Sequence, residues 1–412
     1  MGNNTNTYKQ TDIGLIPTDW EVKRLADGTN YVDYRGKTPT KTESGILLIT
    51  ARNIKAGYID YKCSTEFIAK SDYQSVMSRG IPEIGDVLIT TEAPMGNVAQ
   101  VDNTNIALAQ RVIKFRAKPT ILINDFLKYY LLSPNFQKLL EDYSTGGTAK
   151  GIKGSTLHKM VLVLPPLPEQ KRMAQILSTW DTAIDNCKTI IEQLKSRNKS
   201  LAQQLLAGKV RVKGFEKTKW KLTPLNECLT FTPREVLKPS GNYLALGLRS
   251  HGKGIFHKHH IDPEDVAMDV LYEVKENDFI VNITFAWEQA LAIVSKKDEG
   301  GLVSHRFPTY TFKTQRAIPE FFRHFIIQKY FKFLMELISP GGAGRNRVMS
   351  KTDLLKLEVK IPDVKEQKAI ANILDTATDE LSQYQQKLQQ LQLQKKGLMQ
   401  QLLTGKTRVK IK

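Results

Sequence analysis

Apolar residues recur at alternating intervals of three and four positions along two long stretches of the chain, within residues 165–212 and 362–409. Sustained over about four heptads, this spacing predicts a long amphipathic helix in each stretch, with an apolar stripe that packs as a coiled coil. The Gln- and Lys-rich remainder is expected to face water. The predicted helix–helix interface consists of Leu177, Ile184, Ile191, Leu194, Leu201, Leu205, Leu374, Leu381, Leu388, Leu391, Leu398 and Leu402.

The two stretches are copies of each other. They align without gaps, and 20 of the 48 aligned positions are identical, including the Glu-Gln-Lys triplets that begin at Glu169 and Glu366. Pro168 suits the first turn of a helix, where its missing N–H is not needed. Gly208 and Gly405 stand where a left-handed residue would end each helix. The chain therefore contains an internal duplication whose repeated part is a helix with defined ends.

One position of the apolar stripe is polar in both copies, Asn198 in the first and Lys395 in the second. Either these residues lie too near a helix end to matter, or they fix register or orientation at some cost in stability. We expect the two helices to pair with each other, and a chain that closes into a pseudo-twofold ring would place them antiparallel. A helix over residues 169–207 would be roughly 58 Å long at ~1.5 Å per residue. A rigid helix of this length can hold two globular segments a fixed distance apart.

The segments that precede the helices, about 17–160 and 215–360, correspond more loosely. Strand-like runs recur in the same order in both, followed by a helical stretch and a glycine-rich loop. Three pairs of residues stand at matching places in the two segments: Arg52 and Arg249, Asp86 and Asp278, and Arg111 and Arg306. The two helices are similar, whereas the segments before them have diverged. This pattern is expected if each segment contacts a different target.

The predicted fold class is α+β, with two globular mixed α/β domains that alternate with two long helices paired as an antiparallel coiled coil. The expected boundaries are 1–162 and 213–359 for the two domains and 163–212 and 360–412 for the two helical regions.

Charge adds a class of partner to this architecture. Sixty Lys and Arg residues against forty-two Asp and Glu give a net charge of +18, which favours a polyanion such as nucleic acid. The basic residues are spread through folded sequence, which favours a docked surface over a disordered tail. A basic protein without a nucleic-acid role is the other interpretation. The three cysteines form no CxxC pair and no membrane span or signal peptide is evident, so we expect a cytoplasmic protein.

Several fragments imitate catalytic motifs. The loop from Gly146 to Gly151 resembles a phosphate-binding loop, but its lysine, Lys153, comes one residue late. The run PDVKEQK imitates a nuclease signature, yet it begins a helix and its copy lacks the aspartate. The histidines His251, His257, His259 and His260 suggest a metal, but the matching segment has none, so a polar loop near DNA is favoured. We therefore expect a chain that binds and does not catalyse, with no catalytic residues and no metal.

Residues that contact DNA are expected in the glycine-rich loops and in the loops beside the strands. Backbone N–H groups with Lys or Arg suit phosphates, while Arg and Asn can read guanine and adenine edges. Any one of these residues could instead be an ordinary surface residue. The candidates are Arg35, Lys37, Arg52, Asn53, Thr91, Arg111, Lys150, Lys153, Arg234, Arg249, His251, Lys253, Arg306, Arg345, Asn346 and Arg347.

Several short motifs recur in a fixed order along the chain: GLIPTDWEVKRL (14–25), TTEAPMGNVA (90–99), LAQRV (108–112), and the Glu-Gln pair that opens each predicted helix (the EQ joint) with QQLLAGK and QQLLTGK. In these residues, nearly the whole chain resembles the specificity (S) subunit of a type I restriction-modification system. The second unit departs from the pattern, with NITFAWEQ where TTEAPMGN would stand.

The resemblance implies a prokaryotic protein with two target recognition domains, each reading one half of a split, asymmetric sequence of double-stranded DNA. The helices would pack antiparallel, fix the spacer and dock two methyltransferase subunits, with restriction/translocase subunits joining for cleavage. S-adenosylmethionine, ATP and Mg²⁺ would then belong to the partners and none to this chain. The alternative is a non-catalytic coiled-coil scaffold whose two heads bind protein or RNA.

Overall fold

The computed structural model describes residues 7–34, 36, 38–147, 150–258, 262–339 and 348–411. The chain forms two compact units. The first comprises residues 1–188 with 386–412, and the second comprises residues 189–385. Each unit therefore combines one globular head with part of both long helices, whereas the predicted boundaries follow the order of the chain.

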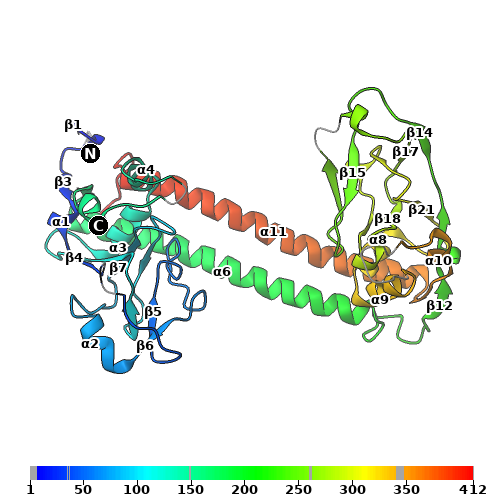
Figure 1. The fold of residues 1–412 in the computed structure, drawn as a ribbon, viewed down its shortest axis with the longest axis horizontal. Coiled ribbons are helices and arrows are strands. Elements are labelled where there is room, and N and C mark those ends of the chain that lie inside the picture. Colours follow the sequence, from blue (N-terminus) through cyan, green and yellow to red (C-terminus); the bar gives the residue numbers. More distant parts are fainter. Residues whose placement is uncertain are drawn as a thin grey trace. The chain divides into compact units, whose positions relative to one another are not determined.

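The long helices are α6 (Leu167–Leu205) and α11 (Val364–Leu403). In the first unit the N-terminal part of α6 lies beside the C-terminal part of α11, where Lys395 pairs with Asp181 (Figure 1). In the second unit the remaining parts of the helices lie together, and Asn198 Nδ2 donates to the Ala377 carbonyl (2.7 Å). The helices are antiparallel within each unit, which confirms the predicted coiled coil.

The helix ends agree with the expected capping. Gly208 and Gly405 follow the two helices with φ of 65° and 73°, a left-handed conformation that other residues adopt only with strain. All of the predicted interface residues are buried or half-buried, with Leu177 fully so.

The head of the first unit is built on a four-stranded antiparallel sheet in the order β4-β10-β7-β8. A second sheet, β6-β5-β9, joins β5 and β9 in parallel, and two strand pairs, β1–β2 and β3–β11, complete the head. The strands are β1 (Tyr8–Thr11), β2 (Gly14–Pro17), β3 (Glu21–Arg24), β4 (Thr29–Asp33), β5 (Ile46–Ile49), β6 (Phe67–Ile68), β7 (Val87–Thr90), β8 (Val98–Gln100), β9 (Ile106–Leu108), β10 (Val112–Ala117) and β11 (Val161–Leu164). The helices are α1 (Leu25–Gly28), η1 (Lys70–Asp72), α2 (Tyr73–Val76), α3 (Asn124–Leu132), α4 (Pro134–Asp142) and α5 (Gly154–Leu157).

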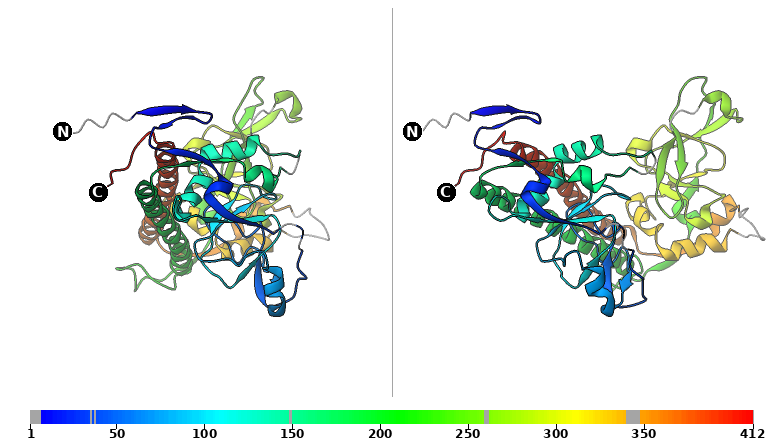
Figure 2. Two further views of the ribbon diagram at one scale, coloured as in Figure 1. Left: turned by 90° about the vertical axis from the view of Figure 1, so that its left-hand side faces the viewer. Right: turned by 60° about the vertical axis from the view of Figure 1, so that its left-hand side comes forward.

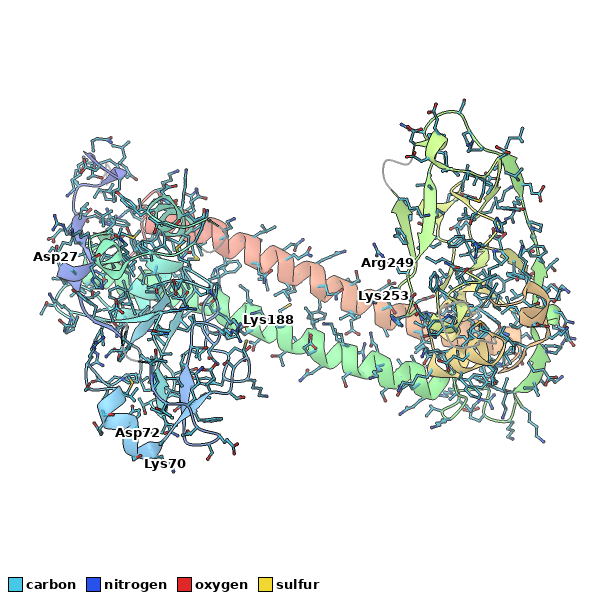
Figure 3. All side chains as sticks on the ribbon, in the orientation of Figure 1. Asp27, Lys70, Asp72, Lys188, Arg249 and Lys253 are labelled. Atoms are coloured by element: carbon cyan, nitrogen blue, oxygen red, sulfur yellow. The ribbon has the colours of Figure 1, made fainter. Side chains whose placement is uncertain are left out.

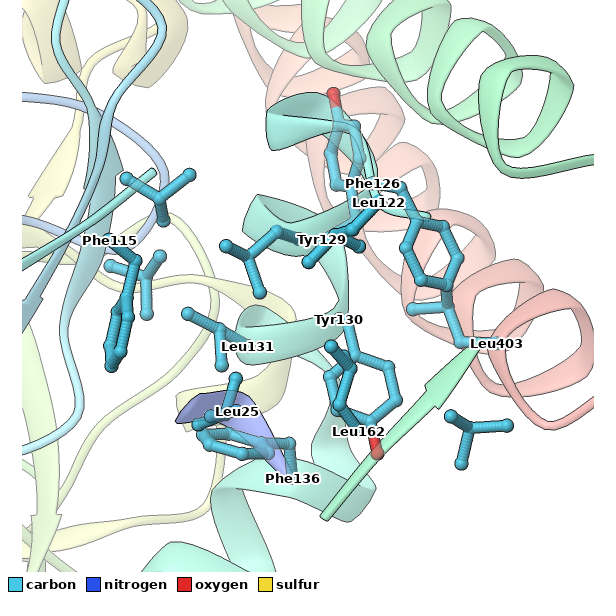
Figure 4. Close-up of a cluster of buried hydrophobic side chains, with 14 of the residues drawn as sticks. Leu25, Phe115, Leu122, Phe126, Tyr129, Tyr130, Leu131, Phe136, Leu162 and Leu403 are labelled. Carbon is cyan, nitrogen blue, oxygen red and sulfur yellow. The ribbon is translucent and has the colours of Figure 1, made fainter. Parts of the chain in front are cut away.

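The core of this head connects the sheet to the long helices. Helix α3 packs across β10, β7 and β8. In the core, Tyr130, Phe136, Leu162 and Leu403 meet from α3, α4, β11 and α11 (Figure 4). Burial in this core raises the pKa of Tyr130 to about 12. The N-terminal hairpin β1–β2 lies beside the C-terminal end of the chain (Figure 2), where the Tyr8 hydroxyl donates to the Gly405 carbonyl (3.1 Å).

The head of the second unit repeats this plan. Its four-stranded sheet has the order β13-β21-β18-β19, its mixed sheet the order β14-β17-β20-β15-β16, and β12 pairs with β22. The strands are β12 (Lys221–Pro224), β13 (Leu229–Phe231), β14 (Glu235–Leu237), β15 (Ala245–Leu248), β16 (Ile255–Lys258), β17 (Val270–Glu273), β18 (Phe279–Val281), β19 (Leu291–Ile293), β20 (Leu302–Val303), β21 (Thr309–Phe312) and β22 (Glu358–Ile361). The helices are α7 (Leu225–Cys228), η2 (Pro263–Asp265), η3 (Ala286–Glu288), η4 (Lys296–Asp298), α8 (Pro319–Phe325), α9 (Lys329–Leu337) and α10 (Lys351–Lys356).

The parallel pair β15 and β20 corresponds to β5 and β9 of the first unit. The structure therefore confirms a duplicated mixed α/β fold, although the two heads share little sequence. No helix in the part of the chain that the structure describes is long and apolar enough to cross a membrane.

Candidate nucleic-acid interface

In the first unit, three segments that the sequence singled out meet beyond the end of β7. The Thr91 N–H donates to the Arg111 carbonyl (2.9 Å), and the Ile152 N–H donates to the Thr91 carbonyl (3.0 Å). The TTEAPMGN loop thus lies between the LAQRV segment and the glycine-rich loop. Backbone hydrogen bonds of this kind hold loops of different sequence in a fixed arrangement.

Arg111 and Arg52 are exposed on the surface that these segments form. Both line a shallow depression of about 360 Å³ together with Lys41 and Glu66, which pair with each other (2.8 Å). Half of the Arg111 side chain is exposed, and its guanidinium pairs with Glu92. The depression thus carries basic side chains with free surface, as a phosphate or base contact requires.

Asn53 and Thr91 do not fit the predicted DNA contact, because both side chains are buried. The Asn53 amide oxygen accepts from the Thr50 N–H (3.0 Å) and hydroxyl (2.9 Å). Its amide nitrogen donates to the carbonyls of Asp60 (3.0 Å) and Ser64 (2.9 Å). Asn53 therefore holds the loop that presents Arg52.

Replacing Asn53 by alanine is expected to lower the stability of the first unit by about 1–3 kcal/mol, because buried backbone groups of this loop lose their partners. Thermal unfolding and hydrogen exchange of residues 50–64 measure the effect. Asn30→Ala, at an exposed position of β4, is the control and should change stability by less than about 0.5 kcal/mol. Unchanged stability together with lost DNA binding would restore Asn53 as a contact residue.

The glycine-rich loop of the first unit carries both predicted lysines on its surface. Lys150 and Lys153 are exposed. They flank Gly151, whose backbone pairs with Thr145 (2.9 Å in each direction). Five further candidates lie outside the described residues: Arg35, Lys37, Arg345, Asn346 and Arg347.

The second unit makes the same connections beyond β18. The Ile283 N–H donates to the Arg306 carbonyl (3.0 Å), and the Met349 N–H donates to the Ile283 carbonyl (2.9 Å). Arg306 is exposed, and its Nη1 donates to the Thr284 hydroxyl (3.1 Å). Arg306 therefore occupies the place that Arg111 occupies in the first unit.

The turn of the β15–β16 hairpin carries the exposed residues Arg249, His251 and Lys253 (Figure 3 labels Arg249 and Lys253). The His251 N–H donates to the Glu288 carbonyl (2.6 Å), which fixes this turn to the NITFAWEQ segment. In the first unit the corresponding loop is fixed to the end of TTEAPMGN, where Asn97 Nδ2 donates to the Ile54 carbonyl (2.7 Å). NITFAWEQ therefore takes the structural place of TTEAPMGN despite its different sequence.

Arg234 is a predicted contact whose guanidinium is already engaged. It forms a two-pronged pair with buried Asp278, with Nη2 at 3.1 Å from Oδ1. In the first unit Arg116 binds Asp86 in the same way, with two contacts of 2.7 Å. The hydrogen bond to Asp86 raises the pKa of Arg116 above its usual value. The structure assigns Arg234 to the support of the strand and not to an exposed contact.

At the repeated EQ joint, side chains that are far apart in the sequence contact one another, and the sequence analysis did not predict these contacts. Glu169 is fully buried, and the indole N–H of Trp20 donates to it (3.0 Å). Arg408, beyond the end of α11, donates to both Glu169 oxygens (2.8 Å each) and also pairs with Asp19. The hydrogen bonds to Glu169, which have the larger effect, and those to Asp19 raise the pKa of Arg408 above its usual value.

The second unit repeats this joint with Glu366. Arg211, beyond the end of α6, donates to both Glu366 oxygens (2.8 and 2.7 Å), and Trp220 donates to Oε2 (3.3 Å). The start of each long helix is therefore fixed to the end of the other. Two repeated features of the sequence could have indicated this contact. An Arg-Val pair follows each long helix, and a Trp stands near the start of each globular segment, in "DW" and in "KW".

The glutamine of the joint fixes each long helix to its own head. The Gln170 side chain accepts from the Ile123 N–H (3.1 Å) and donates to the Ile121 and Pro165 carbonyls (2.8 Å each). Gln367 accepts from Ile318 (3.1 Å) and donates to Arg316 and Pro362 (2.8 and 2.9 Å). The motif that imitated a nuclease is thus a structural joint.

No group of three or more His, Cys, Asp or Glu side chains that could hold a metal occurs among the described residues. His257 lies near Asp298, with Nε2 at 2.9 Å from Oδ1. His259 and His260 lie outside the described residues.

Comparison with known proteins identifies a family. The model of the type I restriction modification DNA specificity domain matches residues 17–196 and 252–393. MjaX, a proposed type I restriction enzyme specificity subunit of Methanocaldococcus jannaschii, is 27% identical over 98% of this chain and 97% of its own length. The MjaVIII specificity subunit of the same organism is 30% identical over 51% of this chain and 50% of its own length.

Two solved structures share the fold. The S subunit of a type I restriction-modification system from M. genitalium matches with a TM-score of 0.54 and 14% identity, covering 98% of both chains. A chain solved in a study of complex assembly and conformational transition of the type I R-M system matches with a TM-score of 0.53 and 14% identity, covering 95% of this chain and 99% of its own. The family model and the curated relatives do not favour a scaffold that binds protein or RNA. Because the family model spans more than half of the sequence, the chain belongs to the type I restriction modification DNA specificity family.

Proposed function

We propose that this chain is the DNA-reading subunit of a type I restriction-modification complex, and that each unit reads one half of a split, asymmetric target. The observation that best supports this is the matched pair of exposed arginines, Arg111 and Arg306. In each unit, the carbonyl of this arginine accepts a backbone hydrogen bond from the segment that follows β7 or β18. The loops around them differ in sequence, as expected for surfaces that contact different bases.

The net charge of +18 supports a large sequence-independent contribution to affinity. The exposed loop residues Lys150, Lys153, Arg249 and Lys253 would contribute to it. In this proposal the paired helices α6 and α11 set the separation of the two half-sites.

The chemistry belongs to partner subunits in this proposal. Two methyltransferase subunits would bind S-adenosylmethionine, and restriction/translocase subunits would bring ATP and Mg²⁺. This chain would supply only the recognition of the target DNA sequence.

Lengthening the spacer between the half-sites by one base pair is expected to abolish specific binding. One base pair adds about 3.4 Å and about a tenth of a helical turn, so both heads could no longer meet their bases together. Methylome sequencing of a host that expresses the chain with its partners first identifies the two half-sites. Fluorescence anisotropy of the complex with the methyltransferase subunit then compares duplexes with native and lengthened spacers. Equal affinity for both duplexes would contradict a fixed spacing.

A further inference from the structure

Helix α9 of the second unit exposes an unusually apolar face. Tyr330, Phe333 and Leu337 are 44%, 54% and 62% exposed, and Ile327, just before the helix, is 46% exposed. Residues three and four positions apart share one face of a helix, so these side chains form a continuous stripe. Large apolar side chains gathered on a surface mark interaction sites more often than isolated ones do.

The first unit shows that the fold does not require this stripe. Helix α4 corresponds to α9, because Phe136 and Leu140 are buried in α4 where Phe331 and Met335 are buried in α9. At the positions that match the stripe, α4 carries exposed polar residues: Asn135, Lys138 and Asp142. The apolar stripe is therefore a property of the second unit alone, which is the pattern expected of a binding surface and not of a structural one.

A groove of about 380 Å³ continues from Tyr330 and is lined by Leu206, Trp220, Phe325 and Lys360 among others. The matching groove of the first unit is bordered by Ile13, Leu15 and Ile16 of its β1–β2 hairpin. In the second unit the chain between α6 and β12 forms no hairpin among its described residues. The first unit thus borders its groove with an apolar hairpin of its own chain, and this hairpin has no counterpart among the described residues of the second unit.

The charges around the stripe indicate the chemistry of a partner that would fit it. Lys329 and Lys360 are exposed at the groove, and no carboxylate among the described residues lines it. Lys332 lies beside the stripe and is paired with Glu336 (3.0 Å). An occupant with aliphatic or aromatic residues flanked by acidic side chains complements this surface.

The stripe also adjoins the candidate DNA-contacting loops of its own unit. Helix α9 packs against η3, in the same segment that fixes the β15–β16 turn. The Gln289 side chain donates to the carbonyls of Ile326 (3.2 Å) and Gln328 (3.1 Å). A protein docked on the stripe would therefore lie next to the DNA half-site that this unit is proposed to read.

We infer that the α9 stripe and its groove bind an acidic-flanked apolar segment of a methyltransferase subunit. The inference rests on the proposed function, since a methyltransferase has to reach a base close to the half-site. The first unit lacks the stripe, because the matching face of α4 is polar, and it would hold its methyltransferase subunit through other contacts. The two units of this chain would then differ in how they hold their partners as well as in what they read.

The test replaces the stripe with the residues of the first unit, as Tyr330→Asn, Phe333→Lys and Leu337→Asp together. The full-length chain is titrated with purified methyltransferase subunit in the absence of DNA, using calorimetry and mass photometry. Affinity at one site is expected to fall at least about tenfold, because exposed aromatic anchors dominate binding energy. The matched control, Asn135→Ala, Lys138→Ala and Asp142→Ala, is expected to bind as the native chain does.

Circular dichroism and thermal unfolding check that the triple variant folds, and Phe333→Lys alone is a milder second variant. Native affinity in folded variants would overturn the inference and leave the proposed function intact. A native chain that binds no methyltransferase subunit would overturn both. Loss of self-association or of DNA binding, with methyltransferase binding unchanged, would assign the stripe to a second copy or to DNA and so overturn the inference.

Discussion

Replacing Glu169 by glutamine is expected to lower the free energy of unfolding of the first unit by about 3 kcal/mol. The side chain is fully buried, and Arg408 would keep only Asp19 as a charged partner after the change. Removing one member of a buried ion pair leaves the other charge poorly compensated, which costs more than losing an exposed pair. Urea unfolding, with hydrogen exchange to assign the change to a unit, is the measurement.

Two further variants make this result specific. Glu366→Gln should have a similar effect on the second unit, because Arg211 and Trp220 contact Glu366 as Arg408 and Trp20 contact Glu169. Glu192→Gln removes an exposed pair with Lys195 (2.7 Å) and should cost less than about 1 kcal/mol. Equal, small effects of all three changes would show that the buried joints do not hold the ends of the two long helices together.

Reversing the charge of Lys150 and Lys153 to glutamate is expected to weaken DNA binding by roughly ten- to a hundredfold at ~0.1 M salt, for every DNA sequence. Each lost phosphate contact also reduces the magnitude of the negative slope of log affinity against log salt by about 0.9. Anisotropy with a target duplex and an unrelated duplex, measured over a range of salt concentrations with the methyltransferase complex, tests both effects.

The control for net charge is Lys171→Glu with Arg172→Glu, which makes the same charge change at exposed positions of α6. Exposed charges act over little more than the Debye length of ~10 Å at 0.1 M salt, so this control should bind nearly as the native chain does. If the control weakens binding equally, the glycine-rich loop has no local role. If the loop variant weakens only the target duplex, its lysines contribute to specificity and not to phosphate binding.

The relatives of this chain are named specificity subunits, and the chain is a non-catalytic DNA-recognition component. The rejected motifs fit that role. The run that resembled a nuclease signature, at Glu366 and Gln367, is occupied in holding helices and head together. A buried carboxylate with an arginine and an indole as partners has its acceptor capacity used within the protein.

The sequence was informative wherever structure depends on neighbouring residues. The spacing of three and four places the stripe of α6 and α11 on one face, and positive φ at Gly208 and Gly405 follows from their position after each helix. The alignment of Arg111 with Arg306 also held in space, because both follow equivalent strands. The predictions for Asn53, Thr91 and Arg234 failed to anticipate burial or pairing, since residue type alone does not show whether a polar group is satisfied inside the fold.

By itself, the sequence determined the duplication, the paired helices, the mixed α/β heads and the class of partner, because periodicity, identity between copies and net charge are properties of the chain. Only the tertiary structure decided which residues meet across long separations, such as Glu169 with Arg408 and Trp20. It also decided that Tyr330 and Phe333 are exposed while Phe331 is buried. Apolar residues surround α9 on several sides, and only packing against the rest of the unit selects the face that leaves water.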